Sequence, residues 1–394
     1  MNRLLNVTGW TYLLNGCLNV LLGALLINLL GHYGRGYSEG GALVTLQFLG
    51  FLTGVLTMPW WNRRFGRRRT LTAAAAAICA AEAVIGLLPP WIALFALAPV
   101  AGLGFGLLES TAGTMLLDAA GDKKASAMSK IEVFFGVGSF AMPFAVSFFI
   151  AKQIWTASFF LMAAAALVLA LVWGLLSFRE FNGLLERRPS GEEAPPAKYT
   201  GSERGVLAVM ALLFFVYVGV EVCVISFFPS VFTESYRWDS ASAALTVTGF
   251  WGTMVLGRVL MSIAGAKVRY LPFLYATSGI GAVSFGLLAA GVPAWGAYAV
   301  VLLLGLVLAG IFAIALIYAN ELLPGRTERT SSLCIAAGGL GGSVMPSVAG
   351  FLIEDGSPAI MLAFLAVCSV LMVLLAAAAK RIHAAVTREA NSPA

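Results

Sequence analysis

The sequence has few charged residues and only two histidines, and both shortages exclude a class of protein. Charged residues make up 11% of the 394 positions and hydrophobic residues 60%, which excludes an ordinary soluble domain. His32 and His383 fall in a predicted loop and in the C-terminal tail. No nucleophile–base pair or metal-ligand spacing accompanies them, so we expect neither an enzyme nor a metal site.

Paired cysteines are also missing. Each of the five cysteines lies alone in an apolar run: Cys17, Cys79, Cys223, Cys334 and Cys368. We interpret them as small buried hydrophobic side chains and not as disulfide partners or metal ligands. The only energy source or cofactor that the sequence leads us to expect is a proton gradient.

What the chain does contain is a series of apolar runs of about twenty residues, the length a helix needs to cross a bilayer. We place these runs at 7–30, 41–61, 71–89, 93–118, 128–150, 154–178, 204–231, 241–264, 270–290, 296–320, 330–353 and 358–380. A β-barrel would show short alternating segments instead. We therefore predict an all-α polytopic membrane protein with twelve transmembrane helices in two six-helix bundles. The bundles are 1–178 and 204–394, the latter with a short tail, and 179–203 is a cytoplasmic linker.

The basic residues fix an orientation for these helices. With the N-terminus in the cytoplasm, the external loops hold only Arg35, Lys152 and Arg237 of the 25 Lys and Arg residues. This bias predicts a multi-pass protein of the cell inner (plasma) membrane with both termini cytoplasmic. The bias also accounts for the net charge of +6, so a lipid bilayer is the expected partner and nucleic acid is not.

One carboxylate lies deep in the fourth run. Gly102, Gly106, Glu109 and Gly113 are spaced to share one helical face. The glycines allow neighbouring helices to approach closely. An ionisable group at this depth costs at least about 2.5–3.5 kcal/mol unless it faces a partner or a wet cavity. We interpret Glu109 as the residue that handles a proton and faces a ligand; the alternative is a buried acid that only joins helices.

Further polar groups occupy predicted inner faces. Thr8, Tyr12, Asn15 and Asn19 share one face of the first helix, either as interhelical hydrogen-bonding groups or as the wall of a hydrated pocket. The remaining candidates lie on three other helices: Gln47 on the second, Tyr217 and Glu221 four residues apart on the seventh, and Trp251 on the eighth.

The two halves echo each other in sequence. Gly138-Ser139-Phe140-Ala141-Met142-Pro143 in the fifth helix resembles Gly342-Ser343-Val344-Met345-Pro346 in the eleventh. A six-plus-six repeat with a site near the membrane midplane between the halves is the expected plan, and rocking of one half against the other would give alternating access.

The loop after the second helix carries a family signature. Arg63-Arg64-Phe65-Gly66-Arg67-Arg68-Arg69 resembles the cytoplasmic loop signature of the major facilitator superfamily. That signature has an Asp three residues before the Gly, where this chain has Arg63. The resemblance implies a cytoplasmic gate at Arg63, Arg64, Gly66, Arg67 and Arg68, without the aspartate of many members.

Other segments are more specific. They are Gln47 to Val55, Leu108 to Gly113, Met128 to Gly138, Gly219-Val220-Glu221, Phe250-Trp251-Gly252 and Gly257-Arg258. Together they resemble the proton-linked glucose/mannose symporters of Bacillus type, in the fucose-permease-like branch. The resemblance implies that Glu109 binds sugar and carries the proton. Val20 stands where the fucose permease has a second proton-carrying Asp, so either Glu109 works alone or Glu221 shares the task.

We therefore predict proton-coupled symport of a hexose. The sugar hydroxyls would contact Asn15, Asn19, Gln47 and Glu109, and its C–H face Tyr217 and Trp251. One alternative is a proton-driven exporter of amphiphilic drugs or metabolites, whose pocket would be more aromatic and contain fewer amides. Another is a nontransporting sensor, which would carry an added soluble domain. Because the site lies within one chain, we expect a monomer.

Overall fold

The computed structural model describes residues 2–120, 124–176, Gly183, Tyr199, 201–264, 268–324 and 327–390. Among these residues, every regular element is a helix, and twelve helical segments are long and apolar enough to cross a membrane. The predicted fold class is therefore confirmed. The predicted linker lies outside the described residues except for Gly183, Tyr199 and the start of the helix at Gly201.

The helices of the first half are α1 (Asn2–Tyr33), α2 (Tyr37–Phe65), α3 (Arg67–Gly86), α4 (Trp91–Ala120), α5 (Lys124–Ala151) and α6 (Ala157–Leu175). Those of the second half are α8 (Gly201–Tyr236), α9 (Ser240–Ala264), α10 (Tyr270–Ala289), α11 (Ala294–Leu308), α12 (Ile311–Leu322), α13 (Thr327–Glu354) and α14 (Pro358–Ala390). Helices α11 and α12 belong to one span, which is interrupted at Ala309 and Gly310.

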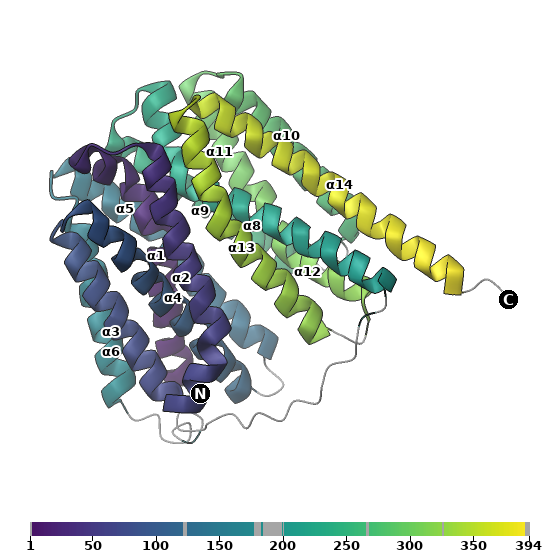
Figure 1. Ribbon diagram of the computed structural model, residues 1–394, viewed down its shortest axis with the longest axis horizontal. Coiled ribbons are helices and arrows are strands. Elements are labelled where there is room, and N and C mark those ends of the chain that lie inside the picture. Colours follow the sequence, from purple (N-terminus) through teal and green to yellow (C-terminus); the bar gives the residue numbers. More distant parts are fainter. Residues whose placement is uncertain are drawn as a thin grey trace.

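The two halves repeat the same three helix pairings. In the first half α1 packs on α5, α2 on α4 and α3 on α6. In the second half α8 packs on α13, α9 on α11 and α10 on α14, as Figure 1 shows. Because the first and second helix of each half take equivalent partners, the sequence repeat corresponds to a repeat in packing.

Glycines make these pairings close. The missing side chain of Gly106 leaves room for the carbonyl of Phe51 on α2, and Gly54 on α2 does the same for the carbonyl of Leu103 on α4. At equivalent places, Gly138 faces the carbonyl of Leu13 and Gly341 that of Phe215. A Cβ at any of these glycines would collide with backbone, so the helices approach as closely as the glycine spacing predicts.

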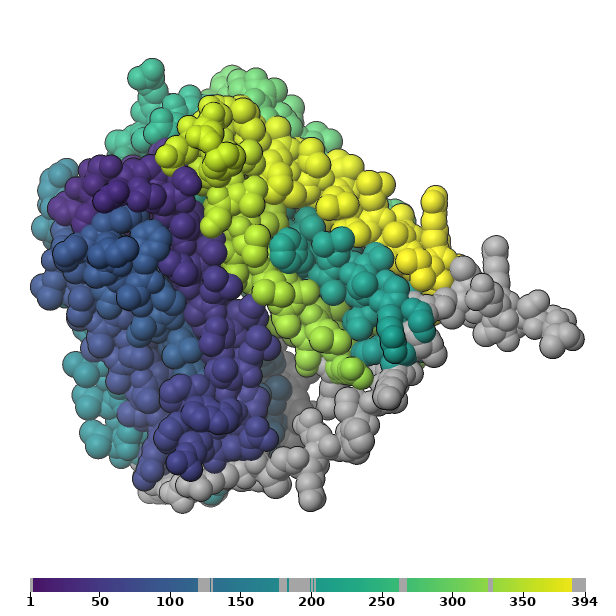
Figure 2. Space-filling model, viewed as in Figure 1, coloured from purple at the N-terminus to yellow at the C-terminus, as the bar shows by residue number. Residues whose placement is uncertain are grey.

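We call the end of the bundle at Arg63–Arg69 the basic end and the opposite end, where α1 ends and α2 begins, the distal end. At the distal end α2 of the first half packs tightly on α13 of the second: Gly350 lies against the carbonyl of Tyr37, and Thr45 and Ser347 are hydrogen-bonded at 2.8 Å. Toward the basic end α2 and α13 diverge, and the halves separate (Figures 1 and 2).

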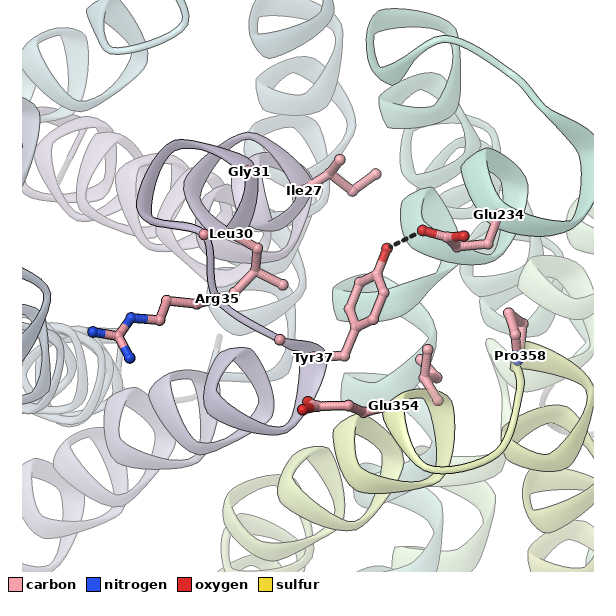
Figure 3. Close-up of a pocket in the computed structure, with 11 residues that line it drawn as sticks. Ile27, Leu30, Gly31, Arg35, Tyr37, Glu234, Glu354 and Pro358 are labelled. Atoms are coloured by element: carbon pink, nitrogen blue, oxygen red, sulfur yellow. Dashed lines mark hydrogen bonds between the residues drawn. The ribbon is translucent and has the colours of Figure 1, made fainter.

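Two carboxylates of the second half complete the distal contact (Figure 3). The Tyr37 hydroxyl donates to Glu234 of α8 at 2.9 Å, and the Ser38 backbone N–H donates to Glu354 of α13 at 2.5 Å. The Glu354 carboxylate thus lies at the N-terminus of α2, where a negative charge is favourable. These residues border a cavity of about 510 Å³, from which the Arg35 side chain points away toward Glu39.

Replacing Glu354 by Gln should loosen the distal contact, because the neutral amide is a weaker acceptor for the N-terminus of α2. In the Glu354→Gln variant, we expect a cysteine placed at Thr45 to react about twofold to fivefold faster with a membrane-impermeant maleimide. The effect is small because an exposed charge-assisted contact contributes little free energy. Asp355→Asn is the matched control, since Asp355 is exposed beside Glu354. Equal labelling in both variants would show that Glu354 does not hold this end closed.

Candidate functional site

A cavity of about 430 Å³ lies between the two halves. Its polar and charged lining residues are Asn19, Glu109 and Glu132 from the first half and Glu221, Trp251 and Arg258 from the second. Its aromatic wall also contains Phe48, Phe51, Phe105, Phe135 and Phe312. The cavity thus brings together three carboxylates, one guanidinium and one amide from the described residues in a largely aromatic enclosure.

Helical periodicity accounts for the positions of these groups. On α9, Trp251 and Arg258 are seven residues apart and therefore share one face, two turns from each other. The Arg258 guanidinium lies 5.4 Å from the centre of the Trp251 ring, which is 1% exposed. The indole N–H of Trp251 has no hydrogen-bond partner among the described residues. A buried donor at a cavity wall can serve a ligand.

Glu109 is one of two acids of the cavity, with Glu221, that form no ion pair among the described residues. Its Oε2 atom is buried and accepts no hydrogen bond from the described part of the chain. The ion pairs of the described residues do not include Glu109. A carboxyl group at this place can accept hydrogen bonds from a ligand and, when protonated, can donate one.

Glu132 and Arg258 are site residues that the sequence-based prediction did not include. Glu132 lies in α5, eight residues after Lys124, and its Oε2 is 3.9 Å from Nη1 of Arg258 on α9. The apolar run was predicted only from residue 128, which placed Glu132 too near a helix end to be assigned to the membrane. The opposite charges of Glu132 and Arg258, each within an apolar span, were the feature of the sequence that could have predicted their pairing. The sequence did not show that α5 and α9 are neighbours.

The structure separates Asn15 and Gln47 from this cavity. Asn15 is fully buried, and its side-chain amide has no hydrogen-bond partner among the described residues. Gln47 donates to the carbonyl of Leu18 at 3.3 Å and borders a separate space of about 20 Å³ beside Glu82. Of the three amides in the prediction, only Asn19 lines the central cavity.

Tyr217 lies behind the cavity wall at the break between α11 and α12. Its hydroxyl donates to the carbonyl of Leu308, the last residue of α11, at 3.1 Å. In the first half, Tyr12 donates to the carbonyl of Glu109 at 3.2 Å. A helix end inside a membrane leaves carbonyls without a partner, and Tyr217 satisfies one of them. The structure thus gives Tyr217 a supporting contact at the wall beside Phe312.

The basic loop forms a second group of predicted residues. Gly66 has a φ of 81° and makes the turn between α2 and α3. Beyond it, Arg67 pairs with Asp118 at the end of α4 at 2.5 Å, and Arg68 donates to the carbonyls of Trp173 and Leu176 at the end of α6. These contacts join α3 to α4 and α6 within one half. Arg63 and Arg64 are exposed.

The size and the lining of the cavity suit the binding of a small molecule. Among the described residues, no cluster of His, Cys, Asp or Glu could hold a metal ion. The cavity volume falls within the range of about 300–1,000 Å³ that is usual for small-molecule sites.

Comparisons with known proteins agree with this geometry. The family model described as Major Facilitator Superfamily matches residues 8–220, more than half of the chain. The glucose/mannose transporter GlcP of Bacillus subtilis (strain 168) is 25% identical over 366 residues, covering 91% of this chain and 90% of that protein. These matches confirm the resemblance to the superfamily and to a Bacillus glucose/mannose transporter.

Solved structures share the fold at low sequence identity. A D-xylose–proton symporter superposes with a TM-score of 0.77 at 16% identity, covering 95% of each chain. A mutant of the nucleoside transporter NupG gives a TM-score of 0.76 at 12% identity, covering 96% of this chain and 99% of that one. At these identities the likeness concerns the fold alone.

Replacing Tyr217 by Phe should destabilise the protein, because the Leu308 carbonyl then lacks its donor. We expect the free energy of unfolding to fall by about 1 kcal/mol, measured as a lower thermal midpoint of the purified protein in detergent. Tyr12→Phe, at the equivalent place in the first half, should have a similar effect. A Tyr217→Phe variant with an unchanged midpoint and weaker ligand binding would instead support the direct binding role predicted from sequence.

Proposed function

The chain belongs to the major facilitator superfamily and is a transporter, not an enzyme, and from this premise we propose that it moves a monosaccharide together with a proton. The observation that carries the proposal is the central cavity, where Glu109 lies without an ion-pair partner among the described residues, in an enclosure built by both halves. The proton gradient is the proposed energy source.

The proposed substrate class rests on the relatives and on the polar groups of the cavity. The Bacillus relative that aligns with nine-tenths of this chain is named a glucose/mannose transporter. Asn19 and Glu109 offer hydrogen-bonding groups for sugar hydroxyls. Trp251 offers an aromatic face and an indole N–H that is unpaired within the described part of the chain. Glucose or mannose is therefore the proposed cargo.

Proton coupling is assigned to Glu109 in this proposal. The neutral acid can donate a hydrogen bond to a sugar hydroxyl, whereas the ionised acid in the same place would require solvation. Loading from outside would then require a proton and a sugar together. Release of both into the cytoplasm would allow the empty carrier to return.

The proposed orientation places the basic end in the cytoplasm, following the distribution of Lys and Arg. Both termini then lie in the cytoplasm, and the host membrane is the cell inner (plasma) membrane. The distal end is external, so the observed contact between α2 and α13 corresponds to an inward-facing carrier. Because one chain builds the whole cavity, we propose a monomer.

A second candidate is an exporter of amphiphilic organic cations, and one observation favours it. The described lining of the cavity contains five phenylalanines and one tryptophan, three carboxylates, and the single amide of Asn19. Aromatic faces attract cations, and the carboxylates outnumber the one guanidinium. The amides of Asn15 and Gln47, which argued for a sugar in the sequence, do not line the cavity.

The proposal predicts that purified protein in liposomes takes up a hexose when an inward proton gradient is imposed. Labelled glucose, mannose, fucose and 2-deoxyglucose form the panel. Glu109→Gln should abolish gradient-driven uptake but retain sugar exchange between the two sides, because the amide mimics the protonated acid. Glu82→Gln is the control, since Glu82 is a buried acid of the same half that lies outside the cavity. Gradient-driven uptake that persists in Glu109→Gln would remove Glu109 from the coupling role.

The second candidate predicts different results in the same liposomes. None of the four sugars would accumulate. An aromatic cationic dye would instead move into the acidic compartment, in exchange for protons that leave that compartment. Trp251→Ala should then weaken dye transport by about tenfold or more, because a desolvated cation–π contact contributes up to about 2 kcal/mol. Uptake of a hexose with no effect of competing dye would exclude this candidate.

A further inference from the structure

We propose that Arg258 is a positioning residue that compensates the charge of Glu132 from the opposite half and of Glu221 from its own half, leaving Glu109 as the carboxylate that exchanges the proton. The inference rests on the proposed function and decides between the two acids, Glu109 and Glu221, that the sequence left open as proton carriers.

The first observation is the position of the ion pair on an interface between halves. Helices α5 and α9 run antiparallel and close together: the Thr248 hydroxyl donates to the carbonyl of Phe140, and Gly252 lies against the Phe140 ring. Ten residues further along α9 from Thr248, Arg258 meets Glu132 at 3.9 Å. The pair therefore crosses from one half to the other at the side of the cavity nearer the basic end.

The second observation is the capacity of the guanidinium. A guanidinium has five N–H donors, and Nη1 is the nitrogen that approaches Glu132. Its position is held by the buried ring of Trp251, and Glu221 of its own half lines the same cavity. One cation thus shares a cavity with carboxylates of both halves.

The third observation concerns the groups that surround Arg258. The titratable side chains near it are Glu132 from α5 and Glu221 and Tyr217 from α8, with Glu109 of α4 across the cavity. Among the described residues, α11 presents Tyr298 to α9 only near Gly249, more than two turns away toward the distal end. Arg258 is accordingly the cation of the described cavity lining, and its ion pair there is with Glu132; Glu221 lies on its own half and Glu109 on the opposite half.

This sharing has a consequence for alternating access. Glu221 and Arg258 belong to the same half, so rocking of the halves leaves their separation nearly unchanged. Glu132 belongs to the other half, so its separation from Arg258 changes with each cycle. Arg258 therefore keeps a carboxylate partner in every state, while the net charge of the cavity is set by the proton on Glu109. A carboxylate deprived of Arg258 would compete with Glu109 for protons.

The test is a pH titration of the conformational equilibrium, which needs no knowledge of the substrate. Spin labels at Arg64 and Leu333, exposed positions toward the basic ends of α2 and α13, report whether that end is open. Cys79 is replaced beforehand, because the other four cysteines are buried. Wild type should show a single pH-dependent step in the distance distribution, and Glu109→Gln should remove it.

In Arg258→Gln, a second carboxylate should become protonated in the same pH range. The midpoint of the conformational step should therefore move upward by about one to three pH units, because the positive charge that favoured the ionised form of this carboxylate is gone. Arg258→Lys, which keeps the charge, should retain the wild-type midpoint. The double variant Arg258→Gln/Glu132→Gln should return the midpoint to the wild-type value. It should do so more completely than the double variant Arg258→Gln/Glu221→Gln. If removal of the carboxylate that has lost Arg258 restores the midpoint, Arg258 acts by compensating charge. A merely structural role would not give this restoration.

Should Arg258→Gln fail to fold, Glu132→Gln provides the second test. Removing this negative neighbour should move the midpoint downward, because Glu109 then becomes harder to protonate. An unchanged midpoint in both Arg258→Gln and Glu132→Gln would overturn the inference, as would a double variant that restores nothing. If these shifts appear but no hexose is transported, the assignment of Arg258 stands and the proposed substrate fails.

Discussion

The structure depends above all on the high free energy of a charge inside the hydrocarbon layer. Three glutamates and one arginine of the described spans reach one cavity between the two halves, and Glu82 of α3 is buried apart from it. Each helix that carries one must therefore turn one particular face inward, which fixes its rotation in the bundle. The charged cavity and the arrangement of twelve helices are consequences of the same constraint.

The backbone imposes a related constraint, because lipid cannot satisfy its polar groups. Unbroken helices meet this requirement along most of the chain, and glycines let them pack backbone to backbone. The span formed by α11 and α12 is interrupted beside the cavity, and there Tyr217 supplies the hydrogen bond that the helix cannot. The two halves are joined at the distal end by α2 and α13 and diverge toward the basic end (Figure 1). Such a body can expose the cavity to one side of the membrane at a time.

The identity of the cargo depends on few groups. Solved transporters with this fold are named for a sugar and a nucleoside, so the fold does not decide the substrate. In this chain the decision falls to Asn19, Glu109, Trp251 and the aromatic wall. The Bacillus relative is named for two hexoses, which supports the proposed sugar, whereas the large aromatic surface and the excess of carboxylates are features that a cation would use. The charge state of the cavity, which we propose is controlled by Arg258 and the proton on Glu109, therefore bears on both candidates.

The sequence by itself determined the class of protein, the twelve spans, the repeat and the depth of Glu109, because span length and helical periodicity are local properties of the chain. It also identified Glu221 by depth, Asn19 by spacing, and Trp251 as an aromatic partner for a sugar within a segment that carries the family resemblance. Only the tertiary structure separated Asn15, Gln47 and Tyr217 from the cavity and brought Glu132 of α5 to Arg258 of α9. A polar face shows that a side chain points inward, but which helix lies opposite depends on packing between segments more than a hundred residues apart.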